Sequence, residues 1–193
     1  MARIGFKSAK YNLHDTSSKK YKGTTATSLE KVIDEKFAPE YNNAELYASD
    51  GLAESDYSFK KGTLTITVAN DDDTKDAELL GNTTATNEVT KSIDDTAPDV
   101  GYGHIVTKMV NGAKKYKVEF FPRVKFSKIT TDAKTRGEGV EFGTTTIEGV
   151  VYPLTEAFNG LTAGVWEKHQ TFDTEAAATA YLDSCLTPAK SGS

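Results

Sequence analysis

The clearest pattern in the chain is the strict alternation of apolar and polar residues over Thr63-Leu64-Thr65-Ile66-Thr67-Val68. Successive side chains of a β-strand point to opposite faces, so the three aliphatic residues share one face and the three threonines share the other. This pattern predicts a half-buried strand. Shorter stretches rich in β-branched and aromatic residues predict further strands, at residues 29–37, 45–48, 123–127 and 140–154.

A β-hairpin is predicted around Asn111-Gly112, a pair typical of tight turns. A two-residue turn would place Lys108 opposite Lys115, and like charges in that position are unfavourable. We therefore predict a three-residue loop with Gly112 in the left-handed conformation, which aligns even-numbered with even-numbered positions. Tyr102, His104 and Val106 then share a face with Tyr116, Val118 and Phe120, whereas Lys115, Lys117 and Glu119 point away. Pro122 lacks an N–H group and requires a bulge or an edge position.

Two helices are expected. Aspartates at positions 71–73 precede residues 76–80 and then Gly81, a pattern in which carboxylates cap the first turn and a glycine ends the last. A calcium loop is the less favoured interpretation, because Lys75 stands where a ligand is needed. Near the C-terminus, Asp173 or Thr174 caps a helix whose apolar positions recur at helical spacing: Ala178, Tyr181, Leu182 and Cys185.

The rest of the chain lacks clear periodicity. Residues 1–28 are polar and are predicted to form an extended arm, residues 52–59 a long loop, and residues 188–193 a flexible end. Residues 29–187 then make one domain. The fold class expected is mainly β, a sandwich or half-barrel of antiparallel strands with a C-terminal helix and one short helix.

Candidate chemistry is sparse. The three histidines, His14, His104 and His169, are far apart and have no partner at metal-ligand spacing, so no catalytic, cofactor or metal site is predicted. His104 is expected to be a core or interface histidine. Cys185 is the single cysteine, which excludes an intramolecular disulfide and favours synthesis in a reducing compartment. No apolar stretch is long enough to span a bilayer, and neither an enzyme nor a membrane partner is predicted.

The charge pattern is more informative. Residues 71–100 carry nine acidic and two basic side chains, a net charge of −7, and residues 101–136 carry a net charge of +7. These blocks either neutralise each other within a subunit or meet between subunits. Candidates for contacts between subunits are Lys115, Lys117, Asp94 and Asp95. The basic strands also resemble single-stranded nucleic-acid platforms, a less favoured alternative because their aromatic residues are expected to face inward.

Several stretches resemble the major tail proteins of long-tailed phages and prophages of Gram-positive bacteria, often labelled the phi13 family. Two of them are Asp94-Asp-Thr-Ala-Pro-Asp-Val-Gly-Tyr-Gly and Lys115-Tyr-Lys-Val-Glu-Phe-Phe-Pro-Arg-Val-Lys-Phe. The others are residues 44–56, 62–68, 137–149 and 171–176. The order and spacing of these stretches, which cover most of the chain from Tyr41, carry the resemblance. Residues 11–22 match less well.

The resemblance implies a structural virion protein, made in the host bacterial cytoplasm, that forms hexameric rings stacked as a tail tube. Its partners would be further copies of itself, the tape measure and tail terminator proteins, and genomic DNA passing through the lumen without specific binding. The irregular segments are expected to provide contacts between rings, with Lys19, Lys20, Glu54 and Asp56 as candidates. The alternative function is an immunoglobulin-like binding module on a virion or cell surface.

Overall fold

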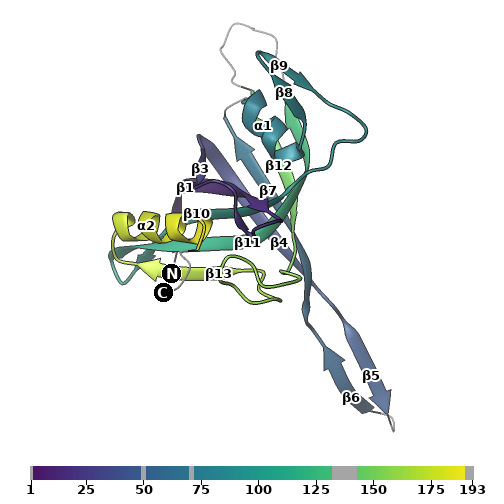
Figure 1. Cartoon of the computed structure of the whole chain (residues 1–193). Helices are drawn as coiled ribbons and strands as arrows, with labels where there is room; N and C mark the ends of the chain where they lie inside the picture. The colour runs from purple at the N-terminus through teal and green to yellow at the C-terminus, as the bar shows by residue number, and fades with distance from the viewer. Residues whose placement is uncertain (1, 49–50, 70–71, 132–142, 190–193) are drawn as a thin grey trace, which may run out of the picture.

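A computed structural model describes residues 2–48, 51–69, 72–131 and 143–189, with the backbone alone for residues 2–3 and 44–56 (Figure 1). The helices are α1 (Asp73–Leu80) and α2 (Glu175–Leu186). The strands, in chain order, are β1 (Ala2–Asp15), β2 (Lys20–Tyr21), β3 (Thr27–Leu29), β4 (Val32–Tyr41), β5 (Ala44–Ala48), β6 (Gly51–Asp56), β7 (Phe59–Val68), β8 (Thr83–Ala85), β9 (Glu88–Thr90), β10 (Asp99–Val110), β11 (Ala113–Thr131), β12 (Thr145–Val151) and β13 (Lys168–Phe172).

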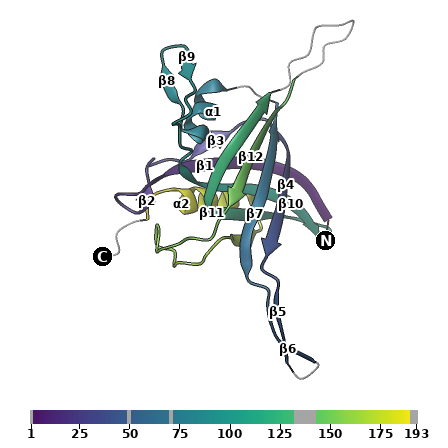
Figure 2. The ribbon, with the colours of Figure 1, turned by 90° about the vertical axis from the view of Figure 1, so that its right-hand side faces the viewer.

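Most strands belong to one large antiparallel sheet, in the order β2-β1-β10-β11-β12-β7-β4, with β3 beside β1 and β13 beside β11. The long strand β11 joins two parts of this sheet. Its first part lies between β10 and β13, and its second part pairs with β12. The sheet curls around this strand (Figure 2). The predicted mainly β architecture, a sandwich or half-barrel with two helices, is confirmed.

Apolar side chains are buried on both faces of the central strands. One cluster fills the inside of the curl and includes Leu64, Ile66 and Val68, as the alternating pattern of β7 predicts. A second cluster lies between β10, β11 and α2, whose Leu182 and Leu186 are fully buried. Gly103 permits this close packing, because a Cβ there would lie 2.6 Å from Leu182 Cδ1. Burial on both faces explains why residues 100–107 are buried without interruption.

The register of the β10–β11 hairpin differs from the one expected. Val110 pairs with Ala113 across a two-residue turn, and Lys108 lies opposite Lys115. Asn111 and Gly112 both have positive φ, 50° and 79°, as the mirror-image turn of type I′ requires. An ion pair between Lys115 and Asp173 reduces the expected repulsion between the two lysines. The turn geometry therefore outweighed the like-charge contact, which at an exposed site costs little.

Two segments expected to be irregular are strands instead. The predicted arm, residues 1–28, contains the long strand β1, which pairs with β10 over most of its length. Lys10 interrupts the apolar pattern of this strand, although its side chain is only 16% exposed and its Nζ atom contacts Asp183 of α2 at 2.6 Å. The predicted loop of residues 52–59 contains β6, which pairs with β5 as a hairpin.

Two prolines lie inside strands, at an edge or a bulge where the missing backbone N–H group is tolerated. Pro39, expected to end a strand, lies inside β4, which is the last strand of the sheet and can spare the missing N–H group. Pro122 lies in β11 next to the register shift between Val100 and Tyr102, in agreement with the predicted bulge.

Both helices form where the sequence predicts them. Asp72 caps α1 by accepting a hydrogen bond from the backbone N–H of Lys75, and Gly81 ends it with φ 72°. Thr174 is the cap of α2. The strand expected at residues 140–154 is observed as β12, and its first residues lie outside the described part of the chain. The polar turn expected at residues 130–139 and the flexible end fall largely outside that part as well.

Candidate functional site

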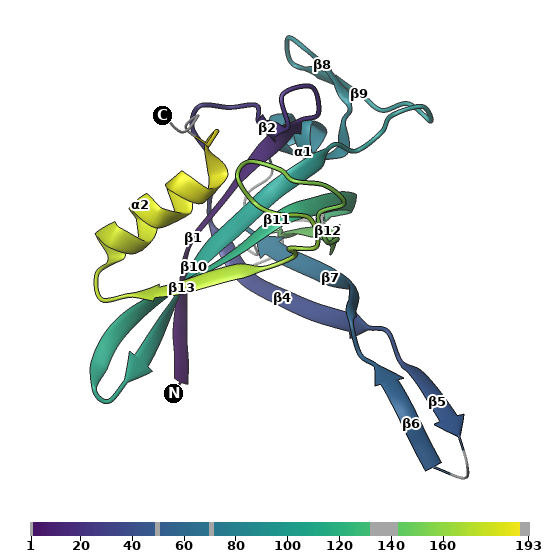
Figure 3. The same ribbon diagram turned by 60° about the horizontal axis from the view of Figure 1, so that its bottom comes forward.

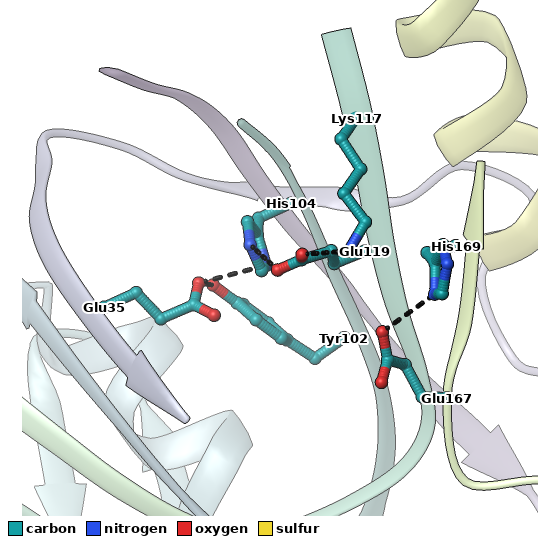
Figure 4. Close-up of polar contacts among 7 residues, drawn as sticks. All are labelled: Glu35, Tyr102, His104, Lys117, Glu119, Glu167 and His169. Carbon is teal, nitrogen blue, oxygen red and sulfur yellow. Dashed lines mark hydrogen bonds and ion pairs between the residues drawn. The ribbon is translucent and has the colours of Figure 1, made fainter. Parts of the chain in front are cut away.

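A cluster of ionisable side chains lies where β4, β10 and β11 come together (Figure 4). At its centre is His104, whose side chain is only 2% exposed. Its Nδ1 atom lies 3.1 Å from a carboxylate oxygen of Glu35, and its Nε2 atom lies 3.1 Å from a carboxylate oxygen of Glu119. The Nζ atom of Lys117 contacts the other oxygen of Glu119 at 2.5 Å. A buried imidazole therefore lies between two carboxylates.

The register and the curl of the sheet bring these residues together. The hairpin pairs His104 with Glu119 and Val106 with Lys117, so all four side chains share one face. Glu35 comes from β4, at the far end of the strand order, and the curl returns β4 to β10. The phenol of Tyr102 donates a 2.6 Å hydrogen bond to Glu35 and thereby joins the edge strand to the centre of the sheet.

The surroundings shift the pKa values of two of these groups in opposite directions. Burial by itself would raise the pKa of Glu119, but the hydrogen bonds and charges of His104 and Lys117 outweigh it and hold that pKa well below its usual range. Glu119 is therefore ionised in the folded protein. Burial raises the pKa of Tyr102 well above its usual value, and the neighbouring carboxylate of Glu35 adds to this effect. Tyr102 therefore remains a hydrogen-bond donor.

A cavity of about 310 Å³ adjoins the cluster. Its lining combines the charged side chains with aromatic rings. The ring of Phe6 stacks on the His104 imidazole at 5.3 Å, and Trp166 stacks on Phe59 at 4.0 Å. Glu167 also lines the cavity and contacts His169 at 3.1 Å. Charged and aromatic groups thus line the same cavity.

The described residues present neither a metal-binding group nor an activated thiol. Among the residues that the structure describes, no group of three histidine, cysteine, aspartate or glutamate side chains is placed to hold a metal ion. Burial raises the pKa of the Cys185 thiol, which disfavours the nucleophilic thiolate. No helix in the described part of the chain is long and apolar enough to cross a membrane.

The charged residues expected at a subunit interface have different surroundings. Lys115 contacts Asp173 on the surface. Lys117 is 14% exposed and is directed towards Glu119, so it is not the exposed charge that the predicted register implied. Asp94 and Asp95 lie in the loop between β9 and β10, where Asp95 accepts hydrogen bonds from Asn82 and from the backbone of Ser92. The structure does not bring these acids to the two lysines within the subunit.

The four residues expected to stack rings fall into two groups. Lys19, in the turn after β1, contacts Glu156, and Lys20 donates to the carbonyl oxygen of Ala189 at 3.1 Å. Glu54 and Asp56 lie in β6, opposite Leu46 and Ala44. The pairs are therefore in separate parts of the molecule.

Reasoning from the sequence did not identify the His104 cluster as a site. The alternation in β10 placed His104 on the same face as Tyr102, which is correct, but the expected register turned Glu119 and Lys117 away from it. The two-residue turn typical of Asn-Gly would have given the observed register. No local signal in the sequence indicates that Glu35 lies beside His104, because this contact depends on the curl of the whole sheet.

A scan against protein-family models and a search of curated proteins both found no match to this chain.

The lowered pKa of Glu119 predicts a specific sensitivity to acid. A carboxyl group with a depressed folded-state pKa stabilises the protein above its unfolded pKa of about 4.3, and this stability is lost as the pH falls towards the folded value. We expect Glu119→Gln to reduce the difference between the free energies of unfolding at pH 7 and pH 3 by about 1–2 kcal/mol. Urea denaturation at both pH values measures this difference.

Glu156→Gln is the matched control, because Glu156 is 59% exposed in a surface ion pair with Lys19. Its acid sensitivity should match that of the wild type. Equal pH dependence of Glu119→Gln and the wild type would contradict the assignment.

Proposed function

We propose that this chain is a structural subunit that assembles with copies of itself into rings, stacked as the tail tube of a long-tailed phage. The observation that carries the proposal is the β5–β6 hairpin. It continues the pair β4 and β7 and extends away from the body of the protein in every view (Figures 1 and 3). An isolated two-stranded hairpin is at best marginally stable in water, so a partner surface would stabilise it.

Two features at the base of this hairpin support the same function. Tyr41 and Tyr57 are 52% and 58% exposed, and aromatic residues are enriched in the centres of protein interfaces. The adjacent strand β4 is the edge of the sheet and leaves a row of backbone groups available to another chain. A projection, exposed aromatic residues and an open edge together favour association.

The distribution of charge also fits association between copies. The acidic region around α1, β8 and β9 lies far from the basic turn between β10 and β11 (Figures 1 and 3). A ring with head-to-tail contacts requires two different complementary patches on each subunit. In this proposal Lys115 serves as one such patch, and the exposed Asp94 with the half-buried Asp95 as the other.

The resemblance of the sequence motifs to phage major tail proteins directs the proposal to a tail tube in the virion. The tube would be a conduit for DNA that binds it without specificity, and its further partners would be the tape measure and tail terminator proteins. In this proposal the chain has a structural and not an enzymatic role. The immunoglobulin-like binding module is less favoured, because most of the strands belong to one curled sheet.

Electron microscopy and light scattering of the purified protein test the proposal. We expect concentrated protein to form rings or tubes of uniform diameter without any cofactor. The measurements should cover low and high salt, since exposed charge contacts weaken as ionic strength rises. A protein that remains monomeric under all of these conditions would contradict the proposal.

A further inference from the structure

We propose that Ile93, in the loop between β9 and β10, is the apolar anchor of a head-to-tail contact between two copies of this chain, in which it packs against Ile4 of the next copy. This inference rests on the proposed function, because its partner is a second copy, and it adds the residues that meet. Ile93 is 99% exposed and Ile4 is 50% exposed. Single exposed apolar side chains are common on protein surfaces, so the surroundings of these two carry the argument.

The loop that carries Ile93 is held by hydrogen bonds. The carboxylate of Asp95 accepts one from the backbone N–H of Ser92 at 2.7 Å and another from the side chain of Asn82 at 2.8 Å. The second bond ties the loop to the residue that follows the end of α1. The backbone N–H of Asp95 also donates to the carbonyl oxygen of Ser92 at 3.2 Å. A loop that is ordered before binding loses little freedom when a partner covers it.

The charges around Ile93 are acidic. Asp94, the next residue, is exposed, and residues 71–100 carry a net charge of −7. Lys75, one of the two bases in this stretch, is already paired with Asp72 at 3.1 Å. Complementary surfaces place opposite charges against each other. The surface that receives Ile93 should therefore be apolar at its centre and basic around it.

Ile4 lies at the basic end of the sheet. It occupies the bulge of β1 between the pairs Arg3–Lys108 and Gly5–Thr107, close to the turn that joins β10 to β11. Two acidic residues at this end, Glu175 and Asp173, pair with lysines. The lysines of β1, β10 and β11 at this end are more numerous than these acids: Lys7, Lys108, Lys114 and Lys115. Ile4 therefore has the surroundings that a partner of Ile93 requires.

The other large apolar side chains that the described residues expose fit less well. Tyr41 and Tyr57 lie at the base of the projecting hairpin. Ile33 lies in β4 between Lys31 and Asp34, where the charges are mixed. Ile4 is thus the exposed apolar residue with a basic surrounding.

The position of the two surfaces requires a contact between copies. The region of α1, β8 and β9 and the turn between β10 and β11 lie far apart in the molecule (Figures 1 and 3). Each copy then offers Ile93 to one neighbour and Ile4 to another. Two different surfaces that complement each other in this way give a heterologous contact, which can close into a ring.

Ile93→Ser tests the anchor. The protein concentration at half-maximal association, measured by light scattering, should rise at least about tenfold, because burial of an isoleucine side chain contributes more than one factor of ten to an equilibrium constant. Ile93→Leu is the matched control and should associate as the wild type does, since it keeps an apolar side chain of the same size. Both variants should fold normally, because Ile93 is 99% exposed in the subunit.

Cross-linking tests the pairing with Ile4. Ile93→Cys and Ile4→Cys are prepared as separate proteins, mixed in equal amounts and oxidised by air with a copper catalyst. We expect cross-linked pairs on a non-reducing gel from the mixture and few from either variant alone. The wild type, oxidised in the same way, gives the background from the half-buried Cys185. The cross-link traps a weak contact and does not require tubes to form.

The outcomes separate this contact from the proposed tube. Tubes of wild-type protein without the cross-link, or association of Ile93→Ser at the wild-type concentration, would overturn the contact and leave the tail tube standing. The cross-link in a protein that forms no tubes would support the contact and count against the tube. Equal cross-linking of Ile93→Cys alone would show that two such loops meet each other and would overturn the pairing with Ile4. The lack of both cross-link and tubes would overturn both proposals.

Discussion

Replacement of Lys117 by glutamate is expected to lower the free energy of unfolding by about 3–5 kcal/mol, the usual cost of breaking a buried ion pair. The side chains of Lys117 and Glu119 are 14% and 9% exposed, so water cannot screen the new pair of carboxylates. His104 then remains beside Glu119, at 3.1 Å. Urea denaturation at pH 7 measures the change.

Lys115→Glu is the matched control, since it makes the same change of charge two residues earlier on β11. Lys115 is 33% exposed and pairs with Asp173, which is 81% exposed. Surface pairs of this kind contribute about 0–1 kcal/mol, so the expected loss is less than about 1 kcal/mol. Similar losses in the two variants would show that Lys117 is not held in a buried pair.

Shortening the projecting hairpin is expected to abolish assembly and to leave the body folded. Asn42 and Ser58 face each other across the ladder, where the N–H of Asn42 donates to the carbonyl oxygen of Ser58 at 2.8 Å. Residues 43–57 can therefore be replaced by Asn-Gly, which closes a two-residue turn of the same type as at positions 111 and 112. Electron microscopy of the concentrated variant and wild type compares their assembly.

The folding of this variant is checked by urea denaturation. Strands β5 and β6 form a separate two-stranded sheet that extends away from the body, so the free energy of unfolding should change by less than about 1 kcal/mol. Tubes formed by a folded, shortened protein would exclude the hairpin as an essential contact. Rings that no longer stack would instead assign it to contacts between rings.

Local features of the sequence determined several elements correctly. Alternation alone located β7 and its buried face, because the two-residue period of a strand is a property of the backbone. Asp72 and Gly81 mark the two ends of α1 because capping and a left-handed glycine satisfy the free backbone groups of a helix. The mainly β fold class followed from many such short signals together.

The register of the central hairpin could also have been predicted, but two local rules conflicted. The like-charge rule favoured a three-residue loop, and the turn preference of Asn-Gly favoured two residues. The backbone preference is the stronger effect, because the repulsion is exposed to water and Asp173, distant in the sequence, pairs with Lys115. The faces of Glu119 and Lys117 depended on this one choice, since a shift of one residue moves every side chain to the other face.

The strand character of β1 and the position of Glu35 were decided only by the tertiary structure. Strand β1 was mistaken for an arm because its identity depends on pairing with β10, about a hundred residues away, and on α2, whose Glu175 and Asp183 pair with its lysines. Glu35 is an ordinary acidic residue of an edge strand in the sequence. It meets His104 because the sheet curls until its last strand faces its centre, and that curl is the summed twist of many strands, which no short stretch of sequence specifies by itself.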